Sequence, residues 1–246
     1  MASDGSDDRR DVKTALRRLR WLLAGLEEGG VQSFHRRKRM EVPELREPLE
    51  VARSVEKDPG ALLEEIREEM GDCRRCRLHE GRTHLVFGEG SPRAQLVFVG
   101  EGPGFDEDRL GRPFVGRAGK LLDKMIQAIG LNREDVYICN VVKCRPPQNR
   151  TPDADEMAAC SPFLFRQIEA VGPRVICALG LCATQALLGR AASMGGVRGR
   201  RLAWRGIPLI CIYHPAYLLR NPVQKGVAWQ DLKQVRRILN EGKHKG

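Results

Sequence analysis

Short apolar runs recur along the chain from residue 95 onward. They lie at residues 95–100, 136–142, 174–179 and 207–212. Such continuously apolar runs are typical of strands that are buried on both faces. Segments with helical spacing lie between them, at residues 118–129, 152–170 and 181–188. Strands that alternate with helices predict an α/β fold, with three layers (αβα) around a central, mostly parallel sheet.

The first 60 residues have a different character. Residues 1–13 are charged and polar, as is typical of disordered segments. Leucines at helical spacing, followed by two glycines, predict a helix over residues 14–28. Residues 31–57 show no periodicity and are interpreted as a linker. We therefore expect a partly helical, partly disordered extension over residues 1–60, followed by a functional domain over residues 61–246.

A further helix is predicted over residues 59–70. Asp58 can cap its first turn, and Pro59 suits the first helical position because that position needs no N–H donor. Gly71 follows the last apolar position and is expected to end the helix.

Positive charge is concentrated in the part of the chain that also carries the apolar runs. The whole chain has a formal net charge of +10. Residues 1–72 carry 14 basic and 17 acidic side chains, whereas residues 73–246 carry 28 and 15, a net charge of +13. A polyanionic partner such as nucleic acid explains this bias, because Lys and Arg release counterions from phosphates. Solubility is an alternative explanation of the same charge.

The sequence contains no predicted membrane span, because no run of 18 or more apolar residues is present. Its first residues also lack the apolar core of a signal peptide. We therefore expect a cytoplasmic protein whose eight cysteines stay reduced and serve as ligands or buried thiols.

The cysteines fall into two groups. Four lie in or beside the apolar runs and are interpreted as small buried apolar residues: Cys139, Cys177, Cys182 and Cys211. The other four form two pairs in arginine-rich, loop-like sequence: Cys73 with Cys76, and Cys144 with Cys160. Four thiolates suffice for a tetrahedral zinc ion or for a 4Fe-4S cluster, and spacing alone does not choose between them.

Three polar side chains follow the predicted strands. Glu101 lies in a glycine-rich turn after the first strand, Asn140 closes the second, and His214 follows the last. Each has an ordinary explanation as a turn or structural residue. Together they predict a polar site, because the carboxyl ends of parallel strands meet at one edge of a sheet. The amide of Asn140 donates and accepts side by side, which matches O4 and N3–H of uracil and mismatches cytosine.

A single aromatic residue, Phe114, lies in a loop over residues 109–119 with three glycines and three arginines. Core packing explains a phenylalanine in such surroundings poorly. Stacking on a nucleic-acid base is the functional alternative.

Four ordered motifs carry a specific resemblance. They are SPRAQLVFVGEGPG (91–104), LGRPFVGRAGKLLDKM (110–125), YICNVVKCRPPQNRTP (137–152) and YHPAYLLR (213–220). This order resembles the family 4 uracil-DNA glycosylases, the bacterial and archaeal iron–sulfur members of their superfamily. The resemblance covers about residues 61–240.

The resemblance implies two catalytic residues. Glu101 would position water or stabilise the cationic sugar, and His214 would bind uracil O2 and stabilise the departing anion. Four residues would bind the base. Phe114 would stack on uracil and Asn140 would read its Watson–Crick edge, while Gly102 would contribute backbone and Glu107 would exclude the methyl group of thymine.

The resemblance further implies that Cys73, Cys76, Cys144 and Cys160 hold a 4Fe-4S cluster with a structural role. Three arginines lie in loops at the expected site, and we expect them to contact DNA: Arg112, Arg117 and Arg220. A related subclass traps the abasic sugar through a basic insertion that ends in histidine. Residues 194–201 are basic but contain no histidine, so trapping is not expected.

The activity implied is excision of uracil from DNA, by flipping the nucleotide and hydrolysing its N-glycosidic bond to leave an abasic site. We expect a monomer that acts at the nucleoid on single- or double-stranded DNA. The alternative is a non-catalytic iron–sulfur or zinc module that binds nucleic acid. The presence of Glu101, Asn140 and His214 argues against this alternative.

Overall fold

The structure is a computed structural model that describes residues 57–241. The helix predicted over residues 14–28 lies outside the described residues, as does nearly all of the predicted linker over residues 31–57.

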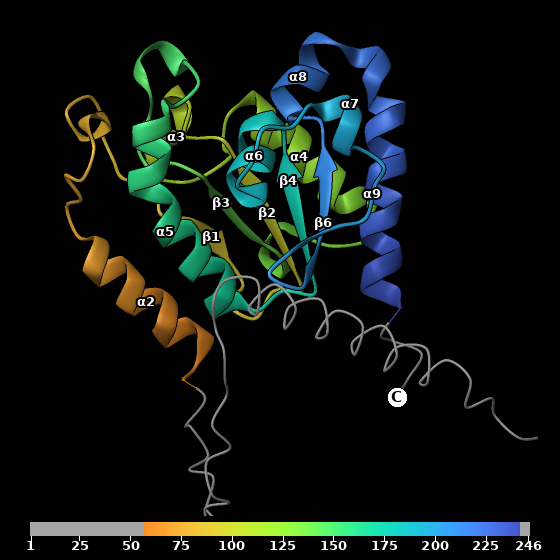
Figure 1. Cartoon of the computed structure of the whole chain (residues 1–246), viewed down its shortest axis with the longest axis horizontal. Helices are drawn as coiled ribbons and strands as arrows, with labels where there is room; N and C mark the ends of the chain where they lie inside the picture. The colour runs from red at the N-terminus through yellow and green to blue at the C-terminus, as the bar shows by residue number, and fades with distance from the viewer. Residues whose placement is uncertain (1–56, 242–246) are drawn as a thin grey trace, which may run out of the picture. The chain divides into compact units, whose positions relative to one another are not determined.

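Within residues 57–241, six strands form one sheet in the order β1-β3-β2-β4-β6-β5 (Figure 1). The strands are β1 (Glu89–Gly90), β2 (Leu96–Gly100), β3 (Tyr137–Asn140), β4 (Val175–Leu179), β5 (Leu202–Trp204) and β6 (Ile207–Ile212). The four central strands are parallel, and the two edge strands pair antiparallel to them. The four predicted strands and the mostly parallel sheet are confirmed. The edge strands β1 and β5 were not predicted.

Helices cover both faces of this sheet. One face packs against α2 (Pro59–Met70), α5 (Ala154–Val171) and α6 (Leu181–Leu188), and the other against α4 (Arg117–Ala128), α8 (Pro215–Arg220) and α9 (Lys225–Asn240). Short helices α3 (Phe105–Leu110) and α7 (Met194–Val197) complete the set, with 3-10 turns at Arg77–His79, Arg133–Asp135, Pro147–Asn149 and Pro222–Gln224.

The alternation of side chains along β2 shows why the strands are continuously apolar. Val97 and Val99 belong to one buried apolar cluster, whereas Leu96 and Phe98 belong to the cluster on the opposite face. Successive side chains of a strand point to opposite faces, so a strand that is covered on both needs apolar residues throughout. The predicted three-layer αβα architecture is confirmed.

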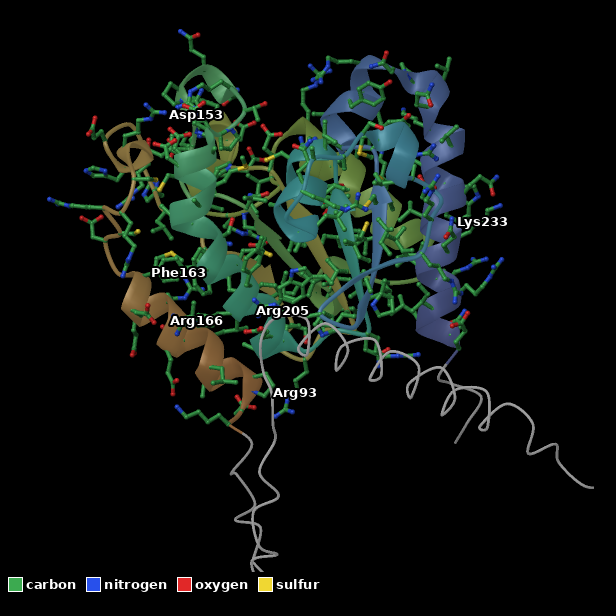
Figure 2. All side chains as sticks on the ribbon, viewed as in Figure 1. Arg93, Asp153, Phe163, Arg166, Arg205 and Lys233 are labelled. Atoms are coloured by element: carbon green, nitrogen blue, oxygen red, sulfur yellow. The ribbon has the colours of Figure 1, made fainter. Side chains whose placement is uncertain are left out.

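Helix α2 begins and ends where its sequence predicts. The Asp58 carboxylate accepts hydrogen bonds from the backbone N–H groups of Gly60 and Ala61, at 3.0 and 3.2 Å. Gly71 ends the helix with a positive φ of 48°. The helix packs on α5, where Arg166 forms an ion pair with Glu69 (Figure 2). No helix among the described residues is long and apolar enough to cross a bilayer.

Candidate active site

A cavity of about 460 Å³ opens beyond the carboxyl ends of the central strands. From β2 the chain adds β3 on one side and β4 and β6 on the other, so the strand order reverses at β2. Ligands of open α/β sheets bind outside such a reversal, and pockets for small ligands span about 300–1,000 Å³. Seven residues predicted for the site line this cavity: Glu101, Gly102, Glu107, Phe114, Asn140, His214 and Arg220.

Asn140 is the last residue of β3, and its side chain is 1% exposed. Its Oδ1 atom is the one buried side-chain nitrogen or oxygen among the described residues that has no hydrogen-bond partner. Leaving such an atom unpaired costs about 1–3 kcal/mol. Gly100, its neighbour in β2, makes room, because a Cβ atom there would lie 2.3 Å from Oδ1. The arrangement keeps a buried acceptor ready for a donor from a ligand.

Phe114 is both a core residue and a wall of the cavity. Its side chain is 5% exposed and packs in the apolar cluster of α4 and α9. The expectation that core packing explains Phe114 poorly is therefore wrong. The reason lies in two glycines: a Cβ at Gly100 would meet the Phe114 ring at 2.5 Å, and one at Gly119 would meet the Phe114 carbonyl oxygen at 1.8 Å. Because both positions are glycine, the Phe114 loop can pack closely against them. The backbone of Phe114 has a positive φ of 50°.

His214 follows β6 and caps the first turn of α8, toward which the β6 arrow points in Figure 1. Its Nδ1 atom accepts a hydrogen bond from the backbone N–H of Ala216 at 3.1 Å. Burial lowers the pKa of His214 to about 4, helped by the positive charge of Arg220. The ring is therefore neutral at neutral pH, with its proton on Nε2. His214 thus lines the cavity as a neutral ring whose centroid lies 5.6 Å from that of Phe114.

Glu101 directly follows β2 at the lip of the cavity. Burial raises the pKa of its carboxyl group, and the neighbouring Thr151 side chain partly opposes this effect. A half-buried carboxylate with a raised pKa accepts a proton from water more readily than an exposed one. Gly102, next in the chain, must be small because a Cβ there would lie 2.7 Å from the Val142 side chain.

Glu107, on α3, lines the cavity and also shapes it. Its Oε1 atom accepts hydrogen bonds from the backbone N–H groups of Val115 and Gly116, both at 2.9 Å. These two groups directly follow Phe114. The carboxylate therefore holds the loop that places the aromatic ring.

The three arginines predicted to contact DNA differ in their surroundings. Arg220 lines the cavity, whereas Arg112 and Arg117 do not. The Arg112 guanidinium binds the carboxylate of Glu89, with Nε 2.7 Å from Oε2. Arg117 is the exposed first residue of α4. All three are exposed.

Four residues that the sequence did not single out also line the cavity: Asn149, Arg150, Thr151 and Tyr217. Asn149 has a positive φ of 55°, and its Oδ1 accepts a hydrogen bond from Arg145 at 2.8 Å. The Arg150 guanidinium binds the buried Glu156 carboxylate at 2.6 and 2.8 Å. Glu156 lies in the first turn of α5, whose cap Asp153 is labelled at the top of that helix in Figure 2. Four consecutive polar residues between prolines, QNRT at 148–151, were the available sequence signal.

The four cysteines predicted as ligands line a second, separate cavity: Cys73, Cys76, Cys144 and Cys160. Two arginines donate to the sulfurs. Arg82 lies 3.1 Å from Cys144 Sγ, and Arg75 lies 3.4 Å from Cys73 Sγ. Guanidinium donors suit thiolates, because a positive charge stabilises the ionised sulfur. In residues 57–241 no group of three His, Cys, Asp or Glu side chains is placed to hold a metal ion.

The other cysteines are buried as predicted: Cys139, Cys177 and Cys211 are 0% exposed and Cys182 is 6% exposed. All eight cysteines are free in the structure.

Comparison with known proteins places this geometry in context. A family model described as the Uracil DNA glycosylase superfamily matches residues 87–233. The chain is 52% identical over 162 residues to the Type-4 uracil-DNA glycosylase of Thermotoga maritima, covering 65% of this chain and 84% of that protein. It is 46% identical over 185 residues to the Type-4 uracil-DNA glycosylase of Sulfurisphaera tokodaii (72% and 84%). For that of Saccharolobus solfataricus the identity is 44% over 187 residues (72% and 87%).

Proposed function

The chain belongs to the uracil-DNA glycosylase superfamily, and from this membership we propose that it is a repair enzyme that excises uracil from DNA. The enzyme hydrolyses the N-glycosidic bond of uracil and leaves an abasic site. One observation carries the proposal above all. A buried, unpartnered Asn140 Oδ1 shares a cavity with a neutral His214 and a half-buried Glu101.

We propose that Asn140 selects the base. Its Oδ1 accepts from N3–H of uracil while its Nδ2 donates to O4, a pairing that cytosine reverses. The Phe114 ring stacks on the base, and Gly102 contributes backbone because its lack of a side chain lets the chain approach. Glu107 stands near C5 and excludes the methyl group of thymine.

The nucleotide must first leave the duplex, which costs a few kcal/mol. Stacking and pocket hydrogen bonds offset that cost. Arg112, Arg117 and Arg220 are exposed and are proposed to bind phosphates around the cavity.

Cleavage of the C1′–N1 bond leaves a cationic, oxocarbenium-like sugar and a uracil anion. His214 donates its Nε2 hydrogen to O2, so the hydrogen bond strengthens as negative charge develops there. The Glu101 carboxylate stabilises the cation and orients water. Water adds its oxygen to C1′ and passes a proton to Glu101. The uracil anion is then protonated from solvent.

We propose that Cys73, Cys76, Cys144 and Cys160 ligate a 4Fe-4S cluster, as the resemblance to the iron–sulfur family implies. Four sulfurs around one cavity supply the required donors, and Arg75 and Arg82 compensate negative charge on them. Bound there, the cluster would cross-link three segments: the loop after α2, the loop after β3, and α5.

The proposed catalytic domain spans residues 61–246. It acts as a monomer on uracil in single- or double-stranded DNA, and its substrate places it in the cytoplasm at the nucleoid.

Excision of uracil from a defined oligonucleotide tests the proposal. Purified protein is incubated with a labelled strand that contains one uracil, and abasic sites are revealed by alkaline cleavage. We expect cleavage at uracil and none in a matched strand with thymine. Glu101→Gln serves as the control for a contaminating enzyme, because it should lose most activity. Salt-sensitive binding without cleavage by the wild-type protein would instead support a non-catalytic nucleic-acid-binding module.

A further inference from the structure

A fully buried lysine is hydrogen-bonded to the main chain of Asn140, a residue of the proposed uracil pocket. Lys143, in the loop after β3, is 1% exposed. Lysine is almost never fully buried unless its ammonium group is partnered. Its Nζ atom donates to the backbone carbonyl oxygen of Asn140 at 2.8 Å and to Oε1 of Gln167 at 2.6 Å. One of the two partners is therefore the main chain of the residue proposed to read the base.

The end of the sheet explains why this carbonyl needs a side-chain donor. The backbone N–H of Val141 donates to Gly100 of β2 at 2.9 Å. The carbonyl of Asn140 belongs to the same peptide unit and points the opposite way, toward the β1 side of β3. On that side β1 pairs only with Tyr137 and Ile138, so within residues 57–241 no strand pairs with Asn140 from that side. A buried carbonyl without a partner is rare, and Lys143 supplies the missing donor.

The second partner of Lys143 belongs to a buried polar network. Gln167, on α5, is 0% exposed, and its Nε2 atom donates to the carbonyl of Phe87 at 2.9 Å and to the Tyr137 hydroxyl at 3.2 Å. Buried polar networks whose members are all satisfied hold one geometry. In contrast, the Asn140 side chain beside this network keeps an unpaired oxygen. The network thus fixes the backbone of a residue whose side chain is left free for a ligand.

We propose that Lys143 is a positioning residue for base recognition: its Nζ group holds the Asn140 main chain so that the Asn140 amide meets the edge of uracil. The inference rests on the proposed role of Asn140 in uracil excision. Lys143 does not line the uracil cavity, so its proposed effect on the base passes through Asn140. It does line the cysteine cavity, next to Cys144, and thereby links the two sites.

If Lys143 has only a structural role, its loss should lower stability without a specific effect on excision. If it positions Asn140, its loss should slow excision, and this effect should depend on the Asn140 side chain. The test is a double-mutant cycle with Lys143→Met, which keeps an unbranched side chain of similar length but removes the donor, and Asn140→Ala. Tyr137→Phe is the matched control, because it removes a hydroxyl from the same network without touching Asn140. Single-turnover excision, thermal midpoint and visible absorbance are measured for each iron-replete variant.

Lys143→Met should slow single-turnover excision by about 10- to 100-fold, because small displacements of a recognition group are costly. In the Asn140→Ala background the same substitution should cost less than about threefold, because the partner through which it acts is gone. Tyr137→Phe should lower the thermal midpoint but keep the rate within about twofold of wild type.

An unchanged rate in Lys143→Met, or a full additive loss in the Asn140→Ala background, would overturn the proposal. If Lys143→Met loses iron or fails to fold, Gln167→Met takes its place in the same cycle, because it removes the second acceptor that holds Nζ in place and leaves the segment at Cys144 unchanged. Additivity there overturns the proposal equally. Excision by the wild-type protein is measured first, since its absence would refute the proposed function itself rather than the role of Lys143.

Discussion

The Nδ1 atom of His214 accepts a hydrogen bond from the backbone N–H of Ala216, the second residue of α8, at 3.1 Å. The main-chain N–H therefore occupies the lone pair of Nδ1. The proton of the neutral ring must then sit on Nε2, where it can face a ligand. The start of a helix therefore selects the tautomer that donates to the substrate.

His214 should stay neutral well below neutral pH. Because burial lowers its pKa to about 4 from 6.5, the unfolded chain binds a proton between these values that the folded protein lacks. The free energy of unfolding should therefore fall as pH drops from about 6.5 to 4, and this component should be absent in His214→Gln. Urea unfolding across this range measures the difference. Nitrogen NMR of the histidines should show the Nε2–H form of His214 at pH 6, and a protonated ring at that pH would contradict the prediction.

Cysteine substitutions should separate into two classes. Alanine at Cys73, Cys76, Cys144 or Cys160 should abolish visible absorbance and lower the thermal midpoint, because ligand binding energy is also folding energy. Cys177→Ala and Cys211→Ala are matched controls, since both residues are buried in the sheet and neither lines the cysteine cavity. They should keep wild-type iron content. Iron loss in the control pair would refute the division of the cysteines, and a colourless wild-type protein that contains zinc would refute the cluster.

Arginine substitutions should differ in their effect on DNA binding. Arg220 lines the cavity, whereas the charge of Arg112 is already paired with Glu89. Arg220→Ala should therefore weaken binding more than Arg112→Ala, and it should reduce the slope of log K against log salt by about 1. Fluorescence anisotropy at several salt concentrations measures both. A wild-type affinity that does not depend on salt would contradict the assignment of a phosphate-binding surface.

The central sheet is predictable from the sequence because strands that are buried on both faces are apolar along their whole length, as β4 is. It does not predict β1 and β5, because strands of two and three residues at a sheet edge are too short for a pattern. Glu101, Asn140 and His214 are predictable for a topological reason, since parallel strands bring their carboxyl ends to one edge.

Other parts of the site depend on tertiary contacts that no local pattern encodes. Phe114 has polar and glycine neighbours that indicate exposure, yet the absence of two Cβ atoms lets it enter the core. Lysine side chains are usually exposed, yet Lys143 is buried, and its Nζ donates to the Asn140 carbonyl beyond the end of β1. Asn149 lines the cavity from a loop with a left-handed backbone, a conformation that its sequence did not lead us to predict.

Asn140→Asp tests the mechanism most sharply. The substitution replaces the Nδ2 donor with a carboxylate oxygen, which when ionised can only accept. Uracil O4 then faces a negative oxygen instead of an N–H group, in a site where the side chain is 1% exposed. Single-turnover excision of uracil from a uracil–guanine duplex should fall by about 100-fold or more, because a buried mismatched polar pair loses its hydrogen bond and leaves both groups unsatisfied.

Asn140→Ala separates the effect of the carboxylate charge in Asn140→Asp from the effect of the lost hydrogen bonds. It removes both hydrogen bonds to uracil without adding an acceptor. Asp at this position should lose more uracil excision than Ala, because only Asp repels O4. The same carboxylate can accept from the amino group of cytosine, so Asn140→Asp should show weak cytosine excision that Asn140→Ala lacks. The three proteins are compared on duplexes that differ only in the target base. Wild-type rates on uracil for both variants would place the base in another pocket and end the assignment of Asn140, even for an active glycosylase.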